Sequence, residues 1–253
     1  MKVTFLGTGT SQGVPVIGCT CETCQSEDPK DYRLRSSMLI ASSGKNIVID
    51  TGPDFRQQML RKRVRQLEAV LFTHEHRDHI AGLDDIRAFN FIQQKSMDVF
   101  AEERVFRALK FEYAYVFAEK KYPGVPQINQ HLISTDPFNI GVLEIIPIRL
   151  MHYRLPILGF RIADFAYLTD ANYISDEERE KIFESKVLVI NALQKKSHVS
   201  HFNLEQALME IEKINPGKAY LTHISHKMGL HDEVNRQLPE NVFLAYDGLK
   251  IEI

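Results

Sequence analysis

The sequence predicts an α/β fold in which helices flank a double sheet. Short apolar runs rich in β-branched residues alternate with segments of helical periodicity, and Gly, Pro or Asp bounds several of the runs. The chain contains no internal repeat and no low-complexity tract. Hydrophobic residues make up 44% of the 253 residues, which is enough for an extended core. We therefore expect a single domain over residues 1–253.

The expected strands are short apolar runs, and the expected helices lie between them. In chain order the strands are Val3–Leu6, Met38–Ala41, Asn46–Asp50, Ala69–Thr73, Asp98–Ala101, Val142–Ile146, Gly159–Ala163, Ala166–Thr169, Val187–Ile190, Ala219–Thr222, Val242–Ala245 and Lys250–Ile253. The helices are Pro53–Arg65, Ala81–Gln93, Glu102–Glu119, Ser175–Glu184 and Asn203–Ile214.

Helix start signals support three of these helices. Pro53 suits a first-turn position, Ser175 opens a Ser-x-x-Glu capping box, and Asn203 is a good N-cap. The segment Lys120–Pro137 instead holds three prolines and few apolar periodicities. We expect a long loop there that overhangs the functional site.

One motif follows a predicted strand directly and concentrates metal-binding residue types. His74, His76, Asp78 and His79 lie within six positions after the apolar run Ala69–Phe72. In α/β proteins, ligands bind where strands end and loop side chains converge on a rigid scaffold. Histidine and aspartate are the usual nitrogen and oxygen donors for Zn²⁺, Mn²⁺ and Fe. Because Asp78 and His79 follow a turn and offer a second donor set, the cluster predicts two metal ions.

The three cysteines of the chain form a second motif near the N-terminus: Cys19, Cys21 and Cys24. Three thiols cannot form a balanced set of disulfides, and Cys-x-Cys-x-x-Cys in a cytosolic chain indicates thiolate metal ligation. A redox role or simple burial is the alternative. Tetrahedral zinc needs a fourth donor, for which the sequence permits His231 or Asp28 among others. A site with four protein ligands has no open position, so we expect a structural zinc.

The His-x-His-x-Asp-His motif after a strand resembles the metallo-β-lactamase-fold hydrolases, whose fold is a four-layer αββα sandwich with a metal site at one edge. The N-terminal stretches Gly7–Pro15 and Gly18–Cys24 resemble the PhnP-like phosphodiesterase branch of that superfamily. Further segments in the family's order cover nearly the whole chain: Val48–Gly52, Leu168–Asp170, Ser200–Leu204, Leu221–His226 and Tyr246–Gly248.

The resemblance implies a complete set of metal ligands. His152, Asp170 and His223 each follow an apolar run and match family positions. One ion is then held by His74, His76 and His152, the other by Asp78, His79 and His223, and Asp170 bridges both. The fourth ligand of the structural zinc is His226. Asp50 is either a buried acceptor that orients a ligand or an ordinary turn aspartate.

The predicted cofactors define a mechanism. Two divalent ions, zinc or manganese, roughly 3.5–4 Å apart would hold a hydroxide at neutral pH and polarise a phosphoryl oxygen. His201 is the predicted general acid, with His198 as its competitor, and Asp78 counts as catalytic as well as a ligand. Hydroxyl groups near the glycine-rich loop are candidate phosphate contacts: Thr8, Thr10 and Ser11. Ser36 and Ser37 either contact substrate or open a strand.

The resemblance implies a phosphodiesterase that acts on a small phosphate ester, in one form a cyclic ribosyl phosphate. The alternatives are an RNA-processing nuclease of the tRNase Z type, a thioester or lactone hydrolase, and a PqqB-like accessory metalloprotein. A net charge of −2 argues against nucleic acid as a partner, and we interpret the basic run Arg61–Arg65 as a solvated helix end. No run is long and apolar enough to span a membrane, and the N-terminus lacks a signal-peptide pattern, so we expect a cytoplasmic protein. A homodimer is the candidate assembly. Asn191 stands where relatives carry an acidic residue.

Overall fold

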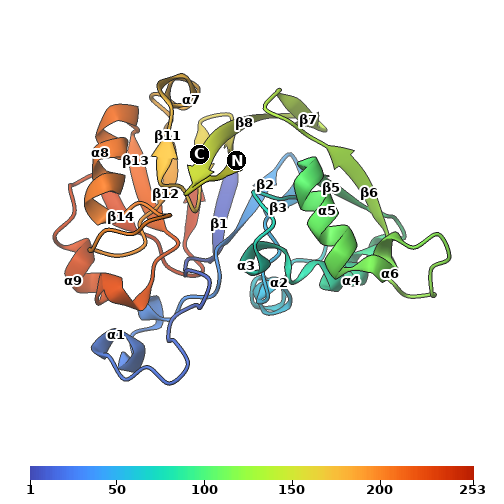
Figure 1. The fold of residues 1–253 in the computed structure, drawn as a ribbon, viewed down its shortest axis with the longest axis horizontal. Helices are drawn as coiled ribbons and strands as arrows, with labels where there is room; N and C mark the ends of the chain where they lie inside the picture. Colours follow the sequence, from blue (N-terminus) through green and yellow to red (C-terminus); the bar gives the residue numbers. More distant parts are fainter.

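Two β-sheets pack face to face, and helices cover the outer face of each sheet, in the computed structural model of residues 1–253 (Figure 1). The four layers follow one another as helices, sheet, sheet and helices, and the two chain termini lie close together near the middle of the view. The main-chain amine of Met1 donates a hydrogen bond to the carbonyl of Ile253, 2.7 Å away. The predicted αββα sandwich is confirmed.

The first sheet has seven strands in the order β15-β1-β2-β3-β4-β5-β6. Strands β3 to β6 run parallel, whereas β1 pairs antiparallel with both β2 and β15. The strand bounds are β1 Lys2–Gly7, β2 Ser37–Ser42, β3 Lys45–Ile49, β4 Ala69–Leu71, β5 Met97–Ala101, β6 Ile128–Leu132 and β15 Lys250–Glu252.

The second sheet has eight strands, with β11-β8-β9-β10-β12-β13-β14 in order and β7 paired to β8. Strands β10, β12, β13 and β14 run parallel, so their carboxyl ends meet at one edge. The bounds are β7 Phe138–Ile140, β8 Leu143–His152, β9 Leu155–Ile162, β10 Phe165–Leu168, β11 Tyr173–Ile174, β12 Val187–Asn191, β13 Lys218–Thr222 and β14 Val242–Leu244.

The alternation of side chains along each strand builds three hydrophobic layers. In β12, Val187 and Val189 pack between the sheets, whereas Leu188 and Ile190 pack against the outer helices. In β3, Ile47 points between the sheets in the same way. Because successive side chains of a strand point to opposite faces, a strand buried on both faces must be apolar throughout. This requirement explains the continuous apolar runs of the sequence.

Helices α2 to α6 cover the first sheet, and α7 to α9 cover the second (Figure 1). Short 3₁₀ turns η1 to η3 complete the connections. The bounds are α1 Glu22–Gln25, η1 Pro29–Asp31, α2 Phe55–Lys62, α3 Arg77–Ile80, η2 Leu83–Ile86, α4 Arg87–Gln93, α5 Glu103–Glu112, α6 Ala114–Phe117, α7 Asp176–Glu180, α8 Leu204–Ile214, η3 His226–Met228 and α9 His231–Asn235.

Two predicted helix starts are confirmed, and a third is wrong. The Ser175 hydroxyl accepts from the backbone N–H of Glu178, but the Glu178 carboxylate accepts from Arg149 and Lys181, so this N-cap lacks the reciprocal bond of a capping box. Asn203 forms a reciprocal capping box with Gln206. Pro53 instead precedes the N-cap Asp54 and lies outside the first turn. The predicted helices 81–93 and 102–119 are each divided, since a 3₁₀ turn begins the first and a break at Tyr113 separates α5 from α6.

The prediction of a long loop over 120–137 is wrong, because the segment contains strand β6. This strand pairs parallel with β5 at the outer edge of the first sheet. Residues 120–127 lead into its amino end, the edge opposite to the carboxyl end of β4. The sequence Ile-Asn-Gln-His-Leu lacks apolar alternation because an edge strand is only half covered by neighbours, so its pattern resembled a loop.

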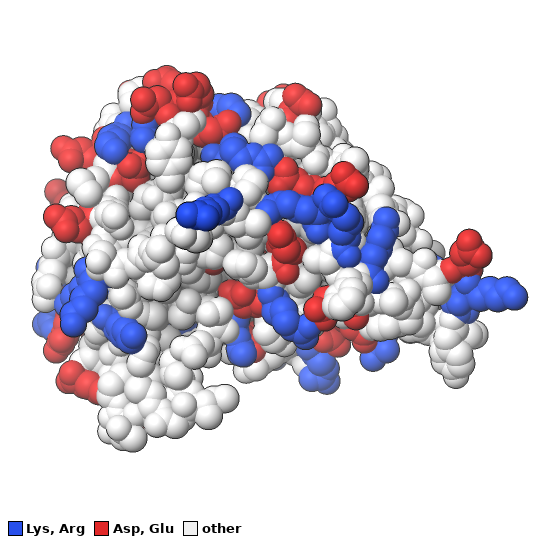
Figure 2. Space-filling model, viewed as in Figure 1, with Lys and Arg blue, Asp and Glu red and all other residues white.

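The charged surface is mixed on the face drawn in Figure 2. Lysine and arginine are interspersed there with aspartate and glutamate, and the projecting lobe around α1 carries few charges. None of the helices combines the length and the apolar character that a bilayer crossing requires.

Candidate metal centres

The structure brings all seven predicted catalytic ligands together at the carboxyl ends of strands. The motif 74–79 follows β4, His152 ends β8, Asp170 follows β10 and His223 follows β13. Their ligand atoms form two groups, in each of which all atoms lie within 4.8 Å of one another. The first group is His74, His76 and His152, and the second is Asp78, His79, Asp170 and His223.

Asp170 connects the second group to the residues around it. Its Oδ2 lies 3.2 Å from Nε2 of His79, and its Oδ1 lies 3.1 Å from Nε2 of both His223 and His201. Asp170 also shares a third group of ligand atoms with His152 and His201. A carboxylate in this position can contribute one oxygen to each of two neighbouring ions.

Three polar residues of the site turn the chain sharply out of a strand. Asp50 after β3, Asp170 after β10 and His223 after β13 all have left-handed backbone, with φ of 63°, 61° and 55°. Residues other than glycine rarely adopt this conformation, at a cost of about 1–2 kcal/mol, although aspartate and histidine tolerate it best. Such strain is typical of functional sites held by the surrounding fold.

Asp50 orients two of the ligands from beneath the site. Its carboxylate accepts from Nδ1 of His79 at 2.8 Å, and from the backbone N–H and hydroxyl of Thr73 at 2.9 and 2.8 Å. The Thr73 hydroxyl in turn accepts from Nδ1 of His74 at 2.9 Å. Both imidazoles therefore carry their proton on Nδ1 and leave Nε2 free to ligate. Asp50 therefore fits the interpretation as a buried acceptor that orients a ligand, and not the alternative of an ordinary turn aspartate.

Two of the other ligating imidazoles, His152 and His223, are held in the same way. Nδ1 of His152 donates to the carbonyl of Ser200 at 2.8 Å, and Nδ1 of His223 faces the Ser36 hydroxyl at 3.3 Å. The Thr10 hydroxyl lies 3.2 Å from Nε2 of His223. These partners belong to segments far from the ligands in sequence, so their pairing had no local signal.

The donor set fits divalent metal ions. Nε2 of His74 and Nε2 of His79 are buried and make no hydrogen bond. A buried polar atom without a partner costs about 1–3 kcal/mol, and one cation in each ligand group would satisfy these two nitrogens. The mixture of imidazole and carboxylate donors suits Zn²⁺ and Mn²⁺.

The electrostatics of the cluster also favour a cation. Burial lowers the pKa of His74 well below its ordinary value and that of His223 to about 4, so both rings are neutral at pH 7. Burial alone would raise the pKa of Asp170, but His223 and His79 outweigh it and hold that pKa well below its usual range. Burial is likewise outweighed at His79, whose pKa is raised by the carboxylates around it. Buried negative charge of this kind needs a compensating positive charge.

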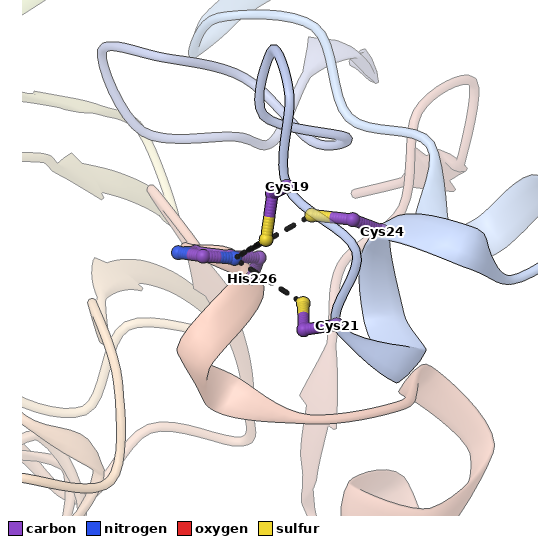
Figure 3. Close-up of side chains that lie close together, drawn as sticks. All are labelled: Cys19, Cys21, Cys24 and His226. Atoms are coloured by element: carbon purple, nitrogen blue, oxygen red, sulfur yellow. Dashed lines mark hydrogen bonds between the residues drawn. The ribbon is translucent and has the colours of Figure 1, made fainter.

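A second centre joins the N-terminal lobe to the C-terminal part of the chain. The Sγ atoms of Cys19 and Cys21 lie 3.3 Å from Nδ1 of His226, and that of Cys24 lies 3.4 Å away (Figure 3). Three sulfurs around one ring nitrogen match the Cys₃His donor set of structural zinc. The backbone N–H of Cys24 lowers the pKa of Cys21 to about 6, which favours its thiolate form.

The two other candidates for the fourth zinc ligand are engaged elsewhere. His231 accepts a hydrogen bond from the guanidinium of Arg33, 3.1 Å away. The Asp28 carboxylate caps η1 by accepting from the backbone N–H of Lys30 at 2.8 Å. The structure therefore places His226 alone of the three beside the thiols.

His201 lies at the edge of the catalytic cluster. Its Nε2 faces Asp170, and its Nδ1 lies 3.0 Å from the Ser200 hydroxyl and 3.2 Å from Nδ1 of His198. The ring is close enough to the donor atoms to touch a reacting group. His198 lies farther out and is exposed. This arrangement agrees with the preference for His201 over His198 as the predicted general acid.

The candidate phosphate contacts divide into two sets. Thr8 is fully buried and donates to Asp247, which rules it out as a phosphate contact. The Ser37 hydroxyl donates to the carbonyls of Ile49 and Asp50, so it supports the strand end.

Thr10 and Ser11 instead line a cavity of about 230 Å³ beside the catalytic cluster. Imidazole, amide, hydroxyl and ammonium groups dominate this cavity, and it contains no carboxylate. Its complete lining is Thr10, Ser11, Gln12, Leu193, Gln194, His198, His201, Ser225, His226 and Lys227.

Comparison with known proteins gives consistent relatives. The sequence profile of the beta-lactamase superfamily domain matches residues 45–224. The crystal structure of a diphosphatase from the PhnP family superposes with a TM-score of 0.93 at 39% identity, covering 99% of this chain and 96% of that one. Zn²⁺-bound PqqB from Methylobacterium extorquens has the same fold, with a TM-score of 0.81 at 16% identity over the full length of both chains.

A relative from Porphyromonas gingivalis carries a different name. It is an octanoyltransferase, 43% identical over 253 residues, which are 99% of this chain and 51% of that protein. A PQQ synthesis protein B from Xanthomonas axonopodis is 26% identical over 62% of this chain and 52% of its own. The chain thus spans about half the length of these curated relatives, and their names describe proteins about twice the matched length.

Proposed function

Since the chain belongs to the metallo-β-lactamase superfamily and to its PhnP family, we propose that it is a metal-dependent phosphoesterase that hydrolyses a small phosphate diester. The observation that carries this proposal is the position of Asp170. Asp170 belongs to the second group of metal-ligand atoms and shares a further group with His152 of the first. His201, which completes that further group, lines a polar cavity without carboxylates. Such a cavity repels no anion, and a phosphate diester is an anion at every physiological pH.

Each of the two groups of residues would hold one divalent ion. His74, His76 and His152 would hold the first, the second group would hold the other, and Asp170 would contact both. When bound, such ions supply a nucleophile from water at neutral pH and neutralise charge on the phosphoryl group. The three thiols of Cys19, Cys21 and Cys24 together with the imidazole of His226 would hold a structural zinc.

The chain's own side chains perform the remaining tasks. Asp50 and Ser36 face Nδ1 of His79 and of His223, so that Nε2 of each imidazole points to the ligand group. His201, at the boundary between cluster and cavity, donates a proton to an alkoxide leaving group. Thr10 and Ser11 offer hydroxyl donors to the phosphate oxygens.

A second candidate function comes from the name octanoyltransferase. That name favours the hydrolysis of an octanoyl thioester, and a metal centre of this type could also perform that reaction. The cavity opposes it, because Leu193 is the one hydrophobic residue among its ten lining residues. An eight-carbon chain would find little apolar surface there, and burying it supplies about 0.8 kcal/mol per methylene only where such surface exists.

The decisive experiment is a substrate panel on the metal-loaded protein. The panel comprises bis-p-nitrophenyl phosphate, a cyclic nucleotide, an octanoyl thioester, a β-lactam and a precursor tRNA. We expect turnover of phosphate esters, abolished by Asp170→Asn, which keeps the left-handed backbone but removes the charge. Asp164→Asn, on the exposed turn between β9 and β10, is the matched control and should retain full activity. Turnover of the thioester with no phosphate ester hydrolysed would overturn the proposal.

A further inference from the structure

The outer layer of helices over the first sheet contains a cavity of about 470 Å³ between α2 and α4. Its floor consists of Phe55, Met59 and Phe89, which are buried, and the rings of Phe55 and Phe89 lie 6.3 Å apart. Leu60 and Ile92 line it from the solvent side and are 62% and 66% exposed. Pockets that enclose small ligands have volumes of roughly 300–1,000 Å³ and mostly apolar walls, so this cavity suits an apolar ligand.

Three arginines also line this cavity: Arg56, Arg63 and Arg65. The chain has 15 arginines, and 11 of them donate hydrogen bonds or form ion pairs within the protein. Of the four that do not, three therefore gather at this one cavity. Asp85 is the single carboxylate of the lining, so the lining carries two uncompensated positive charges. Several free guanidinium groups beside an apolar floor indicate a place for an anion with an apolar part.

The basic run that includes two of these arginines divides between two tasks. Arg61 forms an ion pair with Asp247 at 3.3 Å, and Lys62 donates to a carbonyl of the same C-terminal turn at 3.2 Å. Both cations also lie in the last turn of α2, where they complement the helix dipole. Arg63 and Arg65 follow the helix and have neither role. The interpretation of the run as a solvated helix end therefore fits its first two cations and leaves the other two for the cavity.

The other large apolar cavity of the protein lacks this charge pattern. It has a volume of about 650 Å³ and lies beside α8, over the second sheet. Glu205, Glu212 and Lys195 are the charged residues of its lining, so it carries more negative than positive charge. An amphiphilic anion would be repelled there, whereas the cavity between α2 and α4 would attract it.

We propose that the cavity between α2 and α4 binds one amphiphilic anion, with the apolar chain on the phenylalanine floor and the anionic head at Arg63 and Arg65. A free amphiphile and an anionic lipid at a bilayer surface share this chemistry. The cavity has no lining residue in common with the cavity beside the catalytic cluster, so the inference does not depend on the proposed function.

The test measures the binding of decane-1-sulfonate and 1-decanol to the metal-loaded protein by calorimetry. A sulfonate is chosen because a carboxylate head would also ligate the catalytic metals. We expect one decane-1-sulfonate per chain, and a Kd for decanol that is about 10- to 100-fold higher, the range for lost charged hydrogen bonds. Octane-1-sulfonate should bind about tenfold more weakly than decane-1-sulfonate, because it buries two methylenes fewer. Binding of several molecules per chain, or a decane-1-sulfonate Kd above about 1 mM, overturns the site.

The double variant Arg63→Gln with Arg65→Gln tests the anionic head. Its Kd for decane-1-sulfonate should rise by about 10- to 100-fold, while its Kd for decanol stays at the wild-type value. Arg154→Gln is the matched control, because Arg154 is the fourth arginine without a hydrogen bond or ion pair and lies outside the cavity, over the ring of Tyr153. An unchanged Kd in the double variant, or an equal rise in the control, overturns the proposal.

Ala88→Trp tests the position of the apolar chain. Ala88 is exposed on α4 and lines the cavity, so the indole would fill the space without entering the core. Both probes should bind at least about tenfold more weakly, whereas Ala114→Trp on the exposed start of α6 should leave both Kd values unchanged. Equal Kd values in Ala88→Trp and wild type would place the probe elsewhere and overturn the assignment.

Sedimentation with vesicles distinguishes the two sources of the ligand. Binding to phosphatidylglycerol–phosphatidylcholine vesicles, but not to pure phosphatidylcholine vesicles, that is lost in the double arginine variant supports the site with a bilayer lipid as its ligand. Binding of decane-1-sulfonate without vesicle binding supports it with a free amphiphile. Vesicle binding without any binding of decane-1-sulfonate would show a membrane-contacting surface and overturn the cavity site.

Discussion

Asp50→Asn should disturb the catalytic centre without touching a metal ligand. The Asp50 carboxylate accepts three hydrogen bonds, from Nδ1 of His79 and from the N–H and hydroxyl of Thr73. An amide has one acceptor oxygen in place of two. If that oxygen stays with the N–H of Thr73, the amide NH₂ faces Nδ1 of His79. The imidazole then moves its proton to Nε2, which is the nitrogen that points to the ligand group.

The expected magnitude follows from this tautomer change. Altering a residue that orients a ligand typically weakens metal affinity by about 10- to 100-fold, which corresponds to about 1.4–2.7 kcal/mol. Reversing the amide does not avoid the cost, because the NH₂ would then face the N–H of Thr73. A buried unsatisfied donor costs a similar amount, about 1–3 kcal/mol. We therefore expect Asp50→Asn to bind a divalent ion at the His79 group at least about tenfold more weakly.

The assay is chelator competition followed by metal analysis, with wild type and variant side by side. Asp98→Asn is the matched control, since Asp98 accepts from His131 at 2.9 Å in a similar Asp–His pair, but on β5 and β6 at the far edge of the first sheet. The control should keep the wild-type metal affinity. Equal affinities in Asp50→Asn and wild type would refute the tautomer argument. Equal losses in both variants would indicate a general loss of stability.

Three further predictions concern separate parts of the molecule. Cys21→Ala should remove one zinc per chain and lower Tm by more than Asp170→Asn does, because structural zinc contributes folding free energy. Metal analysis and thermal unfolding test this prediction, and equal Tm shifts in the two variants would contradict it. His201→Ala should keep the catalytic metals, while kcat falls by about 10²–10⁴-fold for substrates with alkyl leaving groups. The fall should be smaller for substrates that release p-nitrophenolate, because this group departs unprotonated. Loss of metal in the variant would instead make His201 a ligand. The third prediction concerns stability in acid. Burial and Arg33 lower the pKa of His231 from 6.5 to about 4 in the folded protein. The unfolded chain therefore takes up the proton first, and folding stability is lost as the pH falls from about 6.5 to about 4. His231→Gln should flatten this loss by up to about 3 kcal/mol in denaturant titrations at pH 7.5 and 4, and an unchanged pH slope would count against it.

The grouping of the ligands was predictable from sequence because each residue follows a local pattern. An apolar run that ends in His or Asp marks a strand end, and parallel strands bring their carboxyl ends to one edge. The structure places Asp170 and His223 together for this reason. The resemblance supplied the order in which distant strand ends meet, which no local pattern contains.

The partners of the ligands were not predictable, because they depend on pairing between distant segments. The Ser200 carbonyl that orients His152 is a backbone group without any residue signature. Asn191 shows the same limit. Its amide accepts from the N–H of Ala171 at 2.7 Å and donates to the carbonyl of Ala171 at 2.9 Å, a pair that a carboxylate could not make. The departure from the acidic residue of relatives therefore supports the backbone directly after Asp170.

His226 and its neighbour Lys227 connect the Cys₃His centre to the cavity beside the catalytic cluster. Both residues lie in η3, whose start is fixed by the Ser225 N–H bonded to the carbonyl of Leu193. The preceding residue, Ile224, exchanges backbone hydrogen bonds with Thr8 and Thr10 of the glycine-rich loop. A zinc ion on His226 would hold this turn against the N-terminal lobe and so fix the wall of the cavity from which Lys227 projects. The cysteines would then stabilise one wall of the cavity, whereas Asp50, Ser36 and Ser200 hold their catalytic ligands through contacts that do not involve the cysteines.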